Sequence, residues 1–160
     1  CTVARLRHEL TGRCVLVLNL HADHESRSAR EHTVAFVSRI VEDLPWPNDV
    51  VVVTGDFNCG ERTTAMAPIQ RNTAQWREKA HTSPCLLDTH RLVHLSASHP
   101  EEEGSFHGFS GIPSTWGGRL DYILTSPHCL QEVLASELWK QQVQGRWPSD
   151  HFPLAAVLRF

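Results

Sequence analysis

The chain has 160 residues, of which 41% are hydrophobic, and a formal net charge of −3 with a pI near 6.4. At this length we expect one domain with a buried core. The mildly acidic balance excludes a global basic field that would attract nucleic acid. No apolar run is long enough to span a membrane.

The five cysteines, at positions 1, 14, 59, 85 and 129, include no CxxC pair and no Cys/His spacing of a zinc site. We expect Cys14 to be a small, buried hydrophobic side chain. Scattered cysteines without a pairing pattern favour a reducing, intracellular compartment. Of the eleven histidines, only His21 and His151 lie in recognisable motifs.

In chain order, the first predicted elements are a strand, a helix and a second strand. Residues 14–20 have the composition of a strand. Ser28 to Glu31 reads Ser-x-x-Glu, a capping-box pattern, and an apolar stripe at helical spacing continues until Pro45 ends the helix. Four consecutive valines predict a fully buried strand over residues 50–54. This order is typical of a layered α/β fold.

The second half of the chain alternates loops with strands. Residues 63–80 are predicted to be helical, with Pro68 in the first turns, where proline is tolerated. The segment 86–95 is ambiguous, and residues 96–105, with three consecutive glutamates, are predicted to form a solvated loop. Three further strands are predicted at 120–124, around 133–139 and at 154–160.

Polar residues lie near one end of four predicted strands: Asn19 and His21, Asp56 and Asn58, Asp121, and Asp150 and His151. Asp56 and Asn58 are two residues apart, so both would leave the same face if the strand geometry persists. A carboxylate and a carboxamide at the mouth of a sheet suit acid/base or metal-assisted chemistry. Taken singly, each motif is equally compatible with a turn or a cap, but the set favours a functional site.

The four motifs are Asn-x-His, Gly-Asp-Phe-Asn, Asp-Tyr-Ile and Ser-Asp-His, and their order and spacing resemble the endonuclease/exonuclease/phosphatase superfamily of metal-dependent phosphoesterases. The resemblance implies an α/β (α+β) fold, a four-layer α-β-β-α sandwich with its N-terminal part missing. Residues 1–160 would then be a partial domain, the C-terminal half to two-thirds. The family's earlier strands, one bearing Asn and one bearing the principal metal-binding Glu, have no match here.

The resemblance also implies divalent-metal-dependent hydrolysis of a phosphodiester or phosphomonoester by in-line attack of water. Asp56 would activate the water, and Asn58 would hold that water or a phosphoryl oxygen. His151 would act as an acid/base or, protonated, as an electrostatic clamp, while Asp121 fixes its tautomer. His21 would contact the phosphate.

The same resemblance assigns Asn19 to supporting His21 in substrate binding, and Asp150 to the binding of Mg²⁺ or Mn²⁺, which favour oxygen ligands. The implied partner is a phosphate-ester substrate, with nucleic acid among the candidates. Trp116 and Phe109 are each either a stacking surface for the substrate or part of the core, and Arg119 either pairs with phosphate or is a surface charge.

A competing hypothesis is a catalytically impaired or inactive family member that keeps the fold as a binding module. The missing Glu favours this hypothesis if the chain is complete, and it predicts low Mg²⁺ affinity for these 160 residues. The intact polar set argues against it, because maintaining the fold does not require these groups: Asp56, Asn58, Asp121, Asp150 and His151. A zinc hydrolase has no supporting ligand spacing.

Overall fold

The computed structural model of the chain describes residues 1–45, 49–69, 86–94, 103–115, 118–126 and 132–159. A five-stranded sheet has the order β1-β2-β3-β5-β4, and a separate two-stranded sheet pairs β6 with β7. The strands are β1 (Thr2–Arg7), β2 (Cys14–His21), β3 (Val50–Asp56), β4 (Leu87–Asp88), β5 (Asp121–Thr125), β6 (Glu132–Leu138) and β7 (Leu154–Arg159). The helices are α1 (Arg27–Glu42) and α3 (Thr89–Val93).

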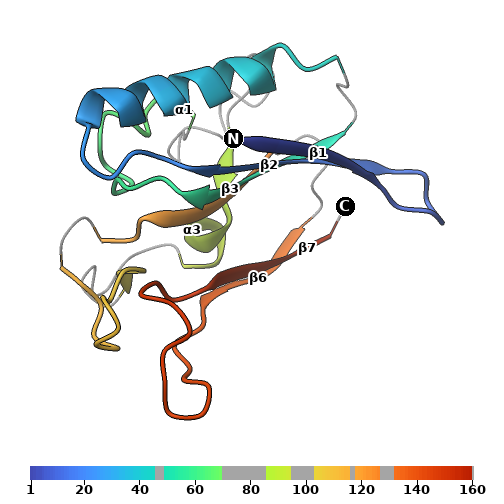
Figure 1. The fold of residues 1–160 in the computed structure, drawn as a ribbon. Helices are drawn as coiled ribbons and strands as arrows, with labels where there is room; N and C mark the ends of the chain where they lie inside the picture. Colours follow the sequence, from blue (N-terminus) through green and yellow to red (C-terminus); the bar gives the residue numbers. More distant parts are fainter. Residues whose placement is uncertain (46–48, 70–85, 95–102, 116–117, 127–131, 160) are drawn as a thin grey trace.

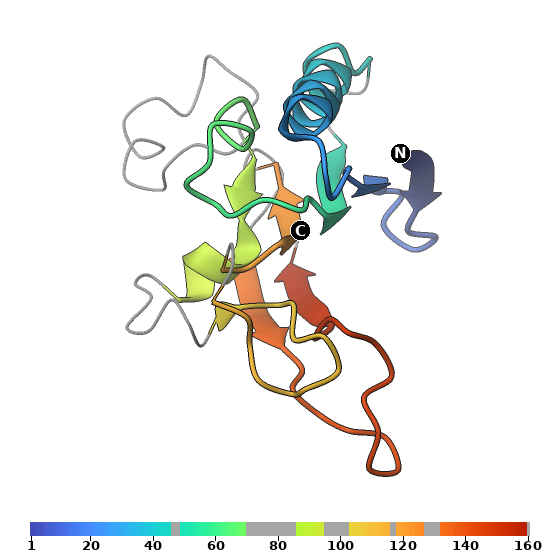
Figure 2. The same ribbon diagram turned by 60° about the vertical axis from the view of Figure 1, so that its left-hand side comes forward.

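The elements are layered. Helix α1 lies over one face of the five-stranded sheet, and the β6–β7 pair lies beyond the opposite face (Figure 1), an arrangement that the rotated view also shows (Figure 2). Helix α3 contacts both β5 and β6 and so lies between the two sheets. The predicted mixed α/β fold and its five predicted strands are confirmed.

Burial follows the sequence pattern. The four valines of β3, Val50 to Val53, are all buried, as expected for a central strand covered on both faces. Alternate residues of β2, including Leu16 and Leu18, join the same core cluster as the buried stripe of α1. Because β2 and β3 are parallel, the chain needs a crossover between them, and α1 supplies it.

The helix begins two residues earlier than the capping-box pattern predicts. Ser26 is the N-cap, and its side chain accepts a hydrogen bond from the Ala29 backbone N–H at 3.2 Å. Asp23 stabilises the turn before this cap, because its Oδ1 accepts hydrogen bonds from the N–H groups of Glu25 and Ser26. Glu31 is held by Arg27 at 2.9 Å instead of capping. The predicted role of Ser28 is therefore wrong.

Several other predictions need correction. Where residues 63–80 are described, at 63–69, they form successive hydrogen-bonded turns and no α-helix. The remainder of that segment lies outside the described residues. Strand β1 was not predicted, because every one of its side chains is exposed and no buried face marks it in the sequence. Cys14 is only half-buried. In the part of the chain that is described, no helix is long and apolar enough to cross a membrane.

Candidate active site

Three of the predicted site residues meet at one end of the five-stranded sheet. Asp56 is the last residue of β3, and the register places it opposite His21 of β2 and Asp121 of β5. Strand β5 runs antiparallel to β3, so its first residue lies beside the last residue of β3. Three polar strand ends that are far apart in the sequence therefore converge at a single edge.

His151 completes this group from the loop before β7. Its Nδ1 donates a hydrogen bond to Asp121 Oδ2 at 2.7 Å, and its Nε2 lies 3.8 Å from Asp56 Oδ2. One ligand atom from each of Asp56, Asp121 and His151 lies within 4.8 Å of the other two. The three side chains are only 17%, 21% and 23% exposed in the same order, so the group is sheltered but reachable from solvent.

The electrostatics distinguish the acid from the histidine. Burial raises the pKa of Asp56 above its ordinary value, and the neighbouring Asp121 carboxylate adds to this rise, while the hydrogen bond from the Asn58 backbone opposes it. The hydrogen bond to Asp121 raises the pKa of His151. Both shifts move these groups toward the range in which acid/base catalysts work.

Asn58 does not lie on the same strand face as Asp56, because β3 ends at Asp56 and Asn58 adopts a left-handed backbone with φ 49°. Its backbone N–H donates to Asp56 Oδ1 at 2.7 Å, and its Nδ2 donates to the Ala22 carbonyl at 2.9 Å. The residue is buried. In this geometry Asn58 orients the Asp56 carboxylate through its main chain.

His21 and Asn19 lie at the exposed side of the site. The His21 side chain is 74% exposed, with Nε2 3.6 Å from Asp56 Oδ2, so it can reach a bound molecule beside that carboxylate. Asn19 is exposed, and its Oδ1 accepts a hydrogen bond from Thr54 Oγ1 at 3.0 Å. That contact orients Asn19 along β2, two residues before His21.

Asp150 is next to His151 but lies outside the group of three. Its main-chain carbonyl accepts hydrogen bonds from the N–H groups of His107 and Gly108, at 2.8 and 3.1 Å. Its side chain is half-buried and its Oδ1 accepts a bond from Ser149 Oγ at 3.4 Å. The loop is thus anchored through its main chain, whereas the Asp150 carboxylate is oriented by the hydroxyl of Ser149.

The donor set suits a hard divalent cation. Asp56 and Asp121 contribute carboxylate oxygens, which Mg²⁺ and Mn²⁺ favour. His151 is a poorer candidate for such an ion, because hard cations prefer oxygen to imidazole nitrogen. The carboxylates therefore fit the metal, and the histidine fits a proton-transfer or charge role.

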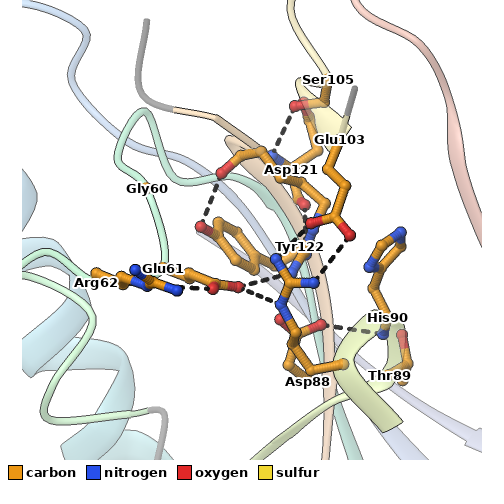
Figure 3. A network of polar contacts seen from close by, with 12 residues as sticks. Gly60, Glu61, Arg62, Asp88, Thr89, His90, Glu103, Ser105, Asp121 and Tyr122 are labelled. Carbon is orange, nitrogen blue, oxygen red and sulfur yellow. Dashed lines mark hydrogen bonds and ion pairs between the residues drawn. The ribbon is translucent and has the colours of Figure 1, made fainter. Parts of the chain in front are cut away.

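Sequence reasoning missed a second polar network behind the site (Figure 3). Arg119 is buried and not a surface charge: its guanidinium pairs with Asp88, lies 3.6 Å from Glu61 and covers the Tyr122 ring at 4.4 Å. Arg91 donates hydrogen bonds to both Glu61 and Glu103 and so links these two carboxylates. Glu103, expected in a solvated loop, is instead half-buried in this network. No motif marks it, because its members come from separate segments.

Ser105 is another residue without a sequence signal. It is fully buried, and its Oγ accepts hydrogen bonds from the backbone N–H groups of Leu120 and Asp121 at 2.9 and 3.2 Å. Phe109, a candidate for substrate stacking, is 60% exposed with φ 64°, and is not a core residue. The other candidate aromatic, Trp116, lies outside the described residues.

Comparison with known proteins places this geometry in a family. The model of the endonuclease/exonuclease/phosphatase family matches residues 5–151. None of the curated protein sequences is significantly similar to the chain. Similar solved structures include an endonuclease/exonuclease/phosphatase from Bacteroides vulgatus, with 23% identity and a TM-score of 0.71 over 98% of this chain and 54% of that one.

Two other similar structures carry more specific names. One is a mannosyl-6-phosphatase of Bacteroides thetaiotaomicron, with 24% identity, a TM-score of 0.70, and 96% of this chain and 54% of that one covered. Another is TDP2 of D. rerio with single-stranded DNA product, with 14% identity, a TM-score of 0.61, and 99% and 60% covered. The chain spans about half the length of the first two structures. It belongs to the endonuclease/exonuclease/phosphatase family.

Proposed function

We propose that the chain contributes the catalytic residues for divalent-metal-dependent hydrolysis of a phosphate ester by in-line attack of water. The observation that carries this proposal is the convergence of Asp56, Asp121 and His151, in which His151 is hydrogen-bonded to one carboxylate and faces the other. An acid with a raised pKa beside an oriented imidazole is the pairing that general acid/base chemistry requires.

Asp56 is the group that orients and deprotonates the attacking water. Its raised pKa makes it a stronger base than an ordinary exposed carboxylate, and the Asn58 N–H fixes its direction at 2.7 Å. Asn58 also remains a candidate for holding the water or a phosphoryl oxygen through its side chain. His21, exposed beside Asp56, contacts the substrate phosphate, with Asn19 supporting it from the same strand.

His151 stabilises charge on the phosphoryl group, as an acid or as a protonated clamp. Its hydrogen bond to Asp121 favours the protonated form and fixes the ring, so that Nε2 points toward Asp56. Asp150 would hold Mg²⁺ or Mn²⁺ through its carboxylate. When bound, such an ion supplies Lewis-acid stabilisation of the phosphoryl oxygens.

For the substrate class we propose a small phosphodiester, a phosphomonoester or a short single strand. The similar solved structures include both a sugar phosphatase and a protein with single-stranded DNA product, so the fold serves both substrate kinds. The net charge of −3 disfavours long duplex DNA, since duplex binding depends on many phosphate contacts to Lys and Arg.

The test is hydrolysis of bis(p-nitrophenyl) phosphate and p-nitrophenyl phosphate by the chain, with Mg²⁺ or Mn²⁺ and with EDTA. We expect turnover that needs the metal and is lost in Asp150→Ala. Asp121→Asn should lower kcat by about 10²–10⁴-fold, because the imidazole loses the carboxylate that orients and charges it.

The matched control is Asp43→Asn, which removes an exposed carboxylate at the end of α1, before β3 begins, and should leave kcat unchanged. Turnover that persists in EDTA, or that survives Asp150→Ala, would refute the proposal. A folded chain that binds a phosphate ester without turnover would instead support the alternative, a binding module that keeps the fold.

A further inference from the structure

The main chain of Asp121 is held by side chains where a neighbouring strand would otherwise pair with it. Strand β4 pairs with β5 only opposite Leu124 and Thr125, so its pairing stops short of Asp121. The Asp121 N–H instead donates to Ser105 Oγ at 3.2 Å, and its carbonyl accepts from Arg119 Nη1 at 3.1 Å. Buried main-chain groups need partners, and here two side chains supply them.

Ser105 also reaches the other half of the site. Its main-chain carbonyl accepts a hydrogen bond from the Phe152 N–H at 2.8 Å, one residue after His151. The next residue, Phe106, forms an isolated β-bridge with His151, and their rings lie 5.2 Å apart. Ser105 is fully buried and its Oγ accepts a second bond, from the Leu120 N–H. One residue therefore contacts the segments that carry both Asp121 and His151.

We propose that Ser105, which lies beside Asp121 (Figure 3), is a positioning residue whose hydroxyl sets the hydrogen bond between Asp121 and His151. The hydroxyl accepts from two consecutive backbone N–H groups at the start of β5. Its main chain meanwhile fixes the loop that presents His151. Without the hydroxyl, both N–H groups lose their acceptor beside a fully buried side chain, and the start of β5 must move to satisfy them. The expected effect of Ser105 on the rate rests on the proposed hydrolase function. Its expected effect on the position of Asp121 does not.

The decisive readout is the Nδ1 proton of His151 in an NMR spectrum, because it reports the Asp121 contact directly. In the unaltered chain we expect this proton downfield, in a hydrogen bond to a carboxylate. In Ser105→Ala it should move upfield or be lost to exchange. Ser105→Cys keeps the shape of the side chain but replaces the oxygen with a larger sulfur, a weaker acceptor, so it should give an intermediate shift without leaving a cavity.

Kinetics give the second readout. Misplacing a catalytic group by about 1 Å costs on the order of 100-fold in rate, so kcat of Ser105→Ala should fall by about 10–100-fold. The KM should change little, because Ser105 is buried and does not touch the substrate. If the unaltered chain shows no measurable turnover, the proposed function fails and kinetics cannot be used. The NMR measurement would still decide the role of Ser105.

Ser126→Ala is the matched control. Ser126 is also buried, and its Oγ accepts the Val51 N–H at 2.8 Å at the opposite end of the β3–β5 pair. This variant should lower stability without moving the His151 proton or kcat. The proposal would be overturned if Ser105→Ala and Ser105→Cys both fold and both keep the His151 proton shift and the kcat of the unaltered chain. An equal effect of Ser126→Ala would overturn it too, and if Ser105→Ala does not fold, Ser105→Cys decides.

Discussion

At the residue scale, the position of Asp56 depends on the glycine before it. Gly55 has φ 137°, a conformation that side-chain-bearing residues rarely adopt, and a Cβ there would lie 1.8 Å from the Leu20 carbonyl oxygen. A side chain at this position would therefore point into the backbone of the neighbouring strand β2. Gly55 thus allows the regular pairing of Leu20 with Gly55 that is followed by the pairing of His21 with Asp56.

Gly55→Ala should therefore destabilise the chain by about 3 kcal/mol or more, because the added methyl group meets backbone atoms that cannot move independently. Urea denaturation measures this free energy of unfolding. Gly145→Ala is the control, since Gly145 also has a positive φ, of 73°, but no atom lies within 4 Å of the added Cβ. It should cost only about 1–2 kcal/mol. Equal costs for the two variants would contradict the argument.

The residues of the candidate site were predictable in part. Asp56, Asp121 and His151 could be found because each lies next to a strong strand pattern, and strand ends meet at sheet edges. Ser105 and Arg119 could not, because their partners follow from tertiary packing and lie in separate segments. A buried arginine has no local pattern that distinguishes it from an exposed one.

At the element scale, prediction succeeded where burial is periodic. The valine run of β3 and the apolar stripe of α1 are visible because one face or both faces are buried. Strand β1 is an edge strand with every side chain exposed, so only its pairing with β2 defines it. The helix start was misplaced because Ser26 and Ser28 are both plausible caps, and the Asp23 turn that selects Ser26 depends on three-dimensional geometry.

The buried ionic network joins elements that the sheet ladder does not. Arg119, just before β5, pairs with Asp88 at the end of β4 and approaches Glu61 in the loop after β3. Arg91 of α3 bonds the same Glu61 at 2.6 Å. Charges this sheltered are stabilising only while each keeps its partners. The network therefore fixes the short β4 and α3 against the central strands.

Arg119→Met should lower the free energy of unfolding by about 3–5 kcal/mol, because Asp88 is left buried without its main countercharge. Thermal and urea denaturation measure the loss. Arg159→Met provides the comparison, since Arg159 pairs with Glu132 at 2.6 Å with both side chains more than half exposed. An exposed pair contributes about 0–1 kcal/mol. A similar loss in both variants would show that the Arg119 network contributes no more than a surface pair.

At the scale of the whole molecule, α3 joins the two sheets. Thr89 Oγ1 lies 3.0 Å from Ser136 Oγ of β6, and His94 Nε2 lies 2.9 Å from the Ser136 carbonyl. His90 lies in the same helix and is buried. The contact between α3 and β6 thus includes polar groups and the His94 imidazole, whose ring lies 4.4 Å from that of His90.

His90 is the group through which pH should act on this packing. Burial lowers its pKa to about 4, and the nearby positive charge of Arg119 adds to the effect. His94 and Arg91 also disfavour a charge on His90, whereas Glu103 favours one. The folded state therefore keeps His90 neutral at a pH at which an unfolded chain would already bind a proton there.

The difference between the folded and unfolded pKa of His90 sets the sign of the pH dependence of stability. With a folded pKa below the unfolded value, the contribution of His90 to stability is complete above about pH 6.5 and is lost as the pH falls toward 4. We expect this one group to lower the free energy of unfolding by about 3 kcal/mol across that window. His90→Leu, which cannot bind a proton, should show a correspondingly flatter profile in urea denaturation at stepped pH.

The control is His24→Gln, because His24 is exposed and its removal should leave the profile of the unaltered chain. Carboxylates titrate in the lower part of the same window, so the informative quantity is the difference between each variant and the unaltered chain at each pH. A profile for His90→Leu as steep as that of His24→Gln would mean that His90 is protonated in the folded state. Its charge would then have to be accommodated beside Arg119, and the contact between the sheets would not depend on a neutral imidazole.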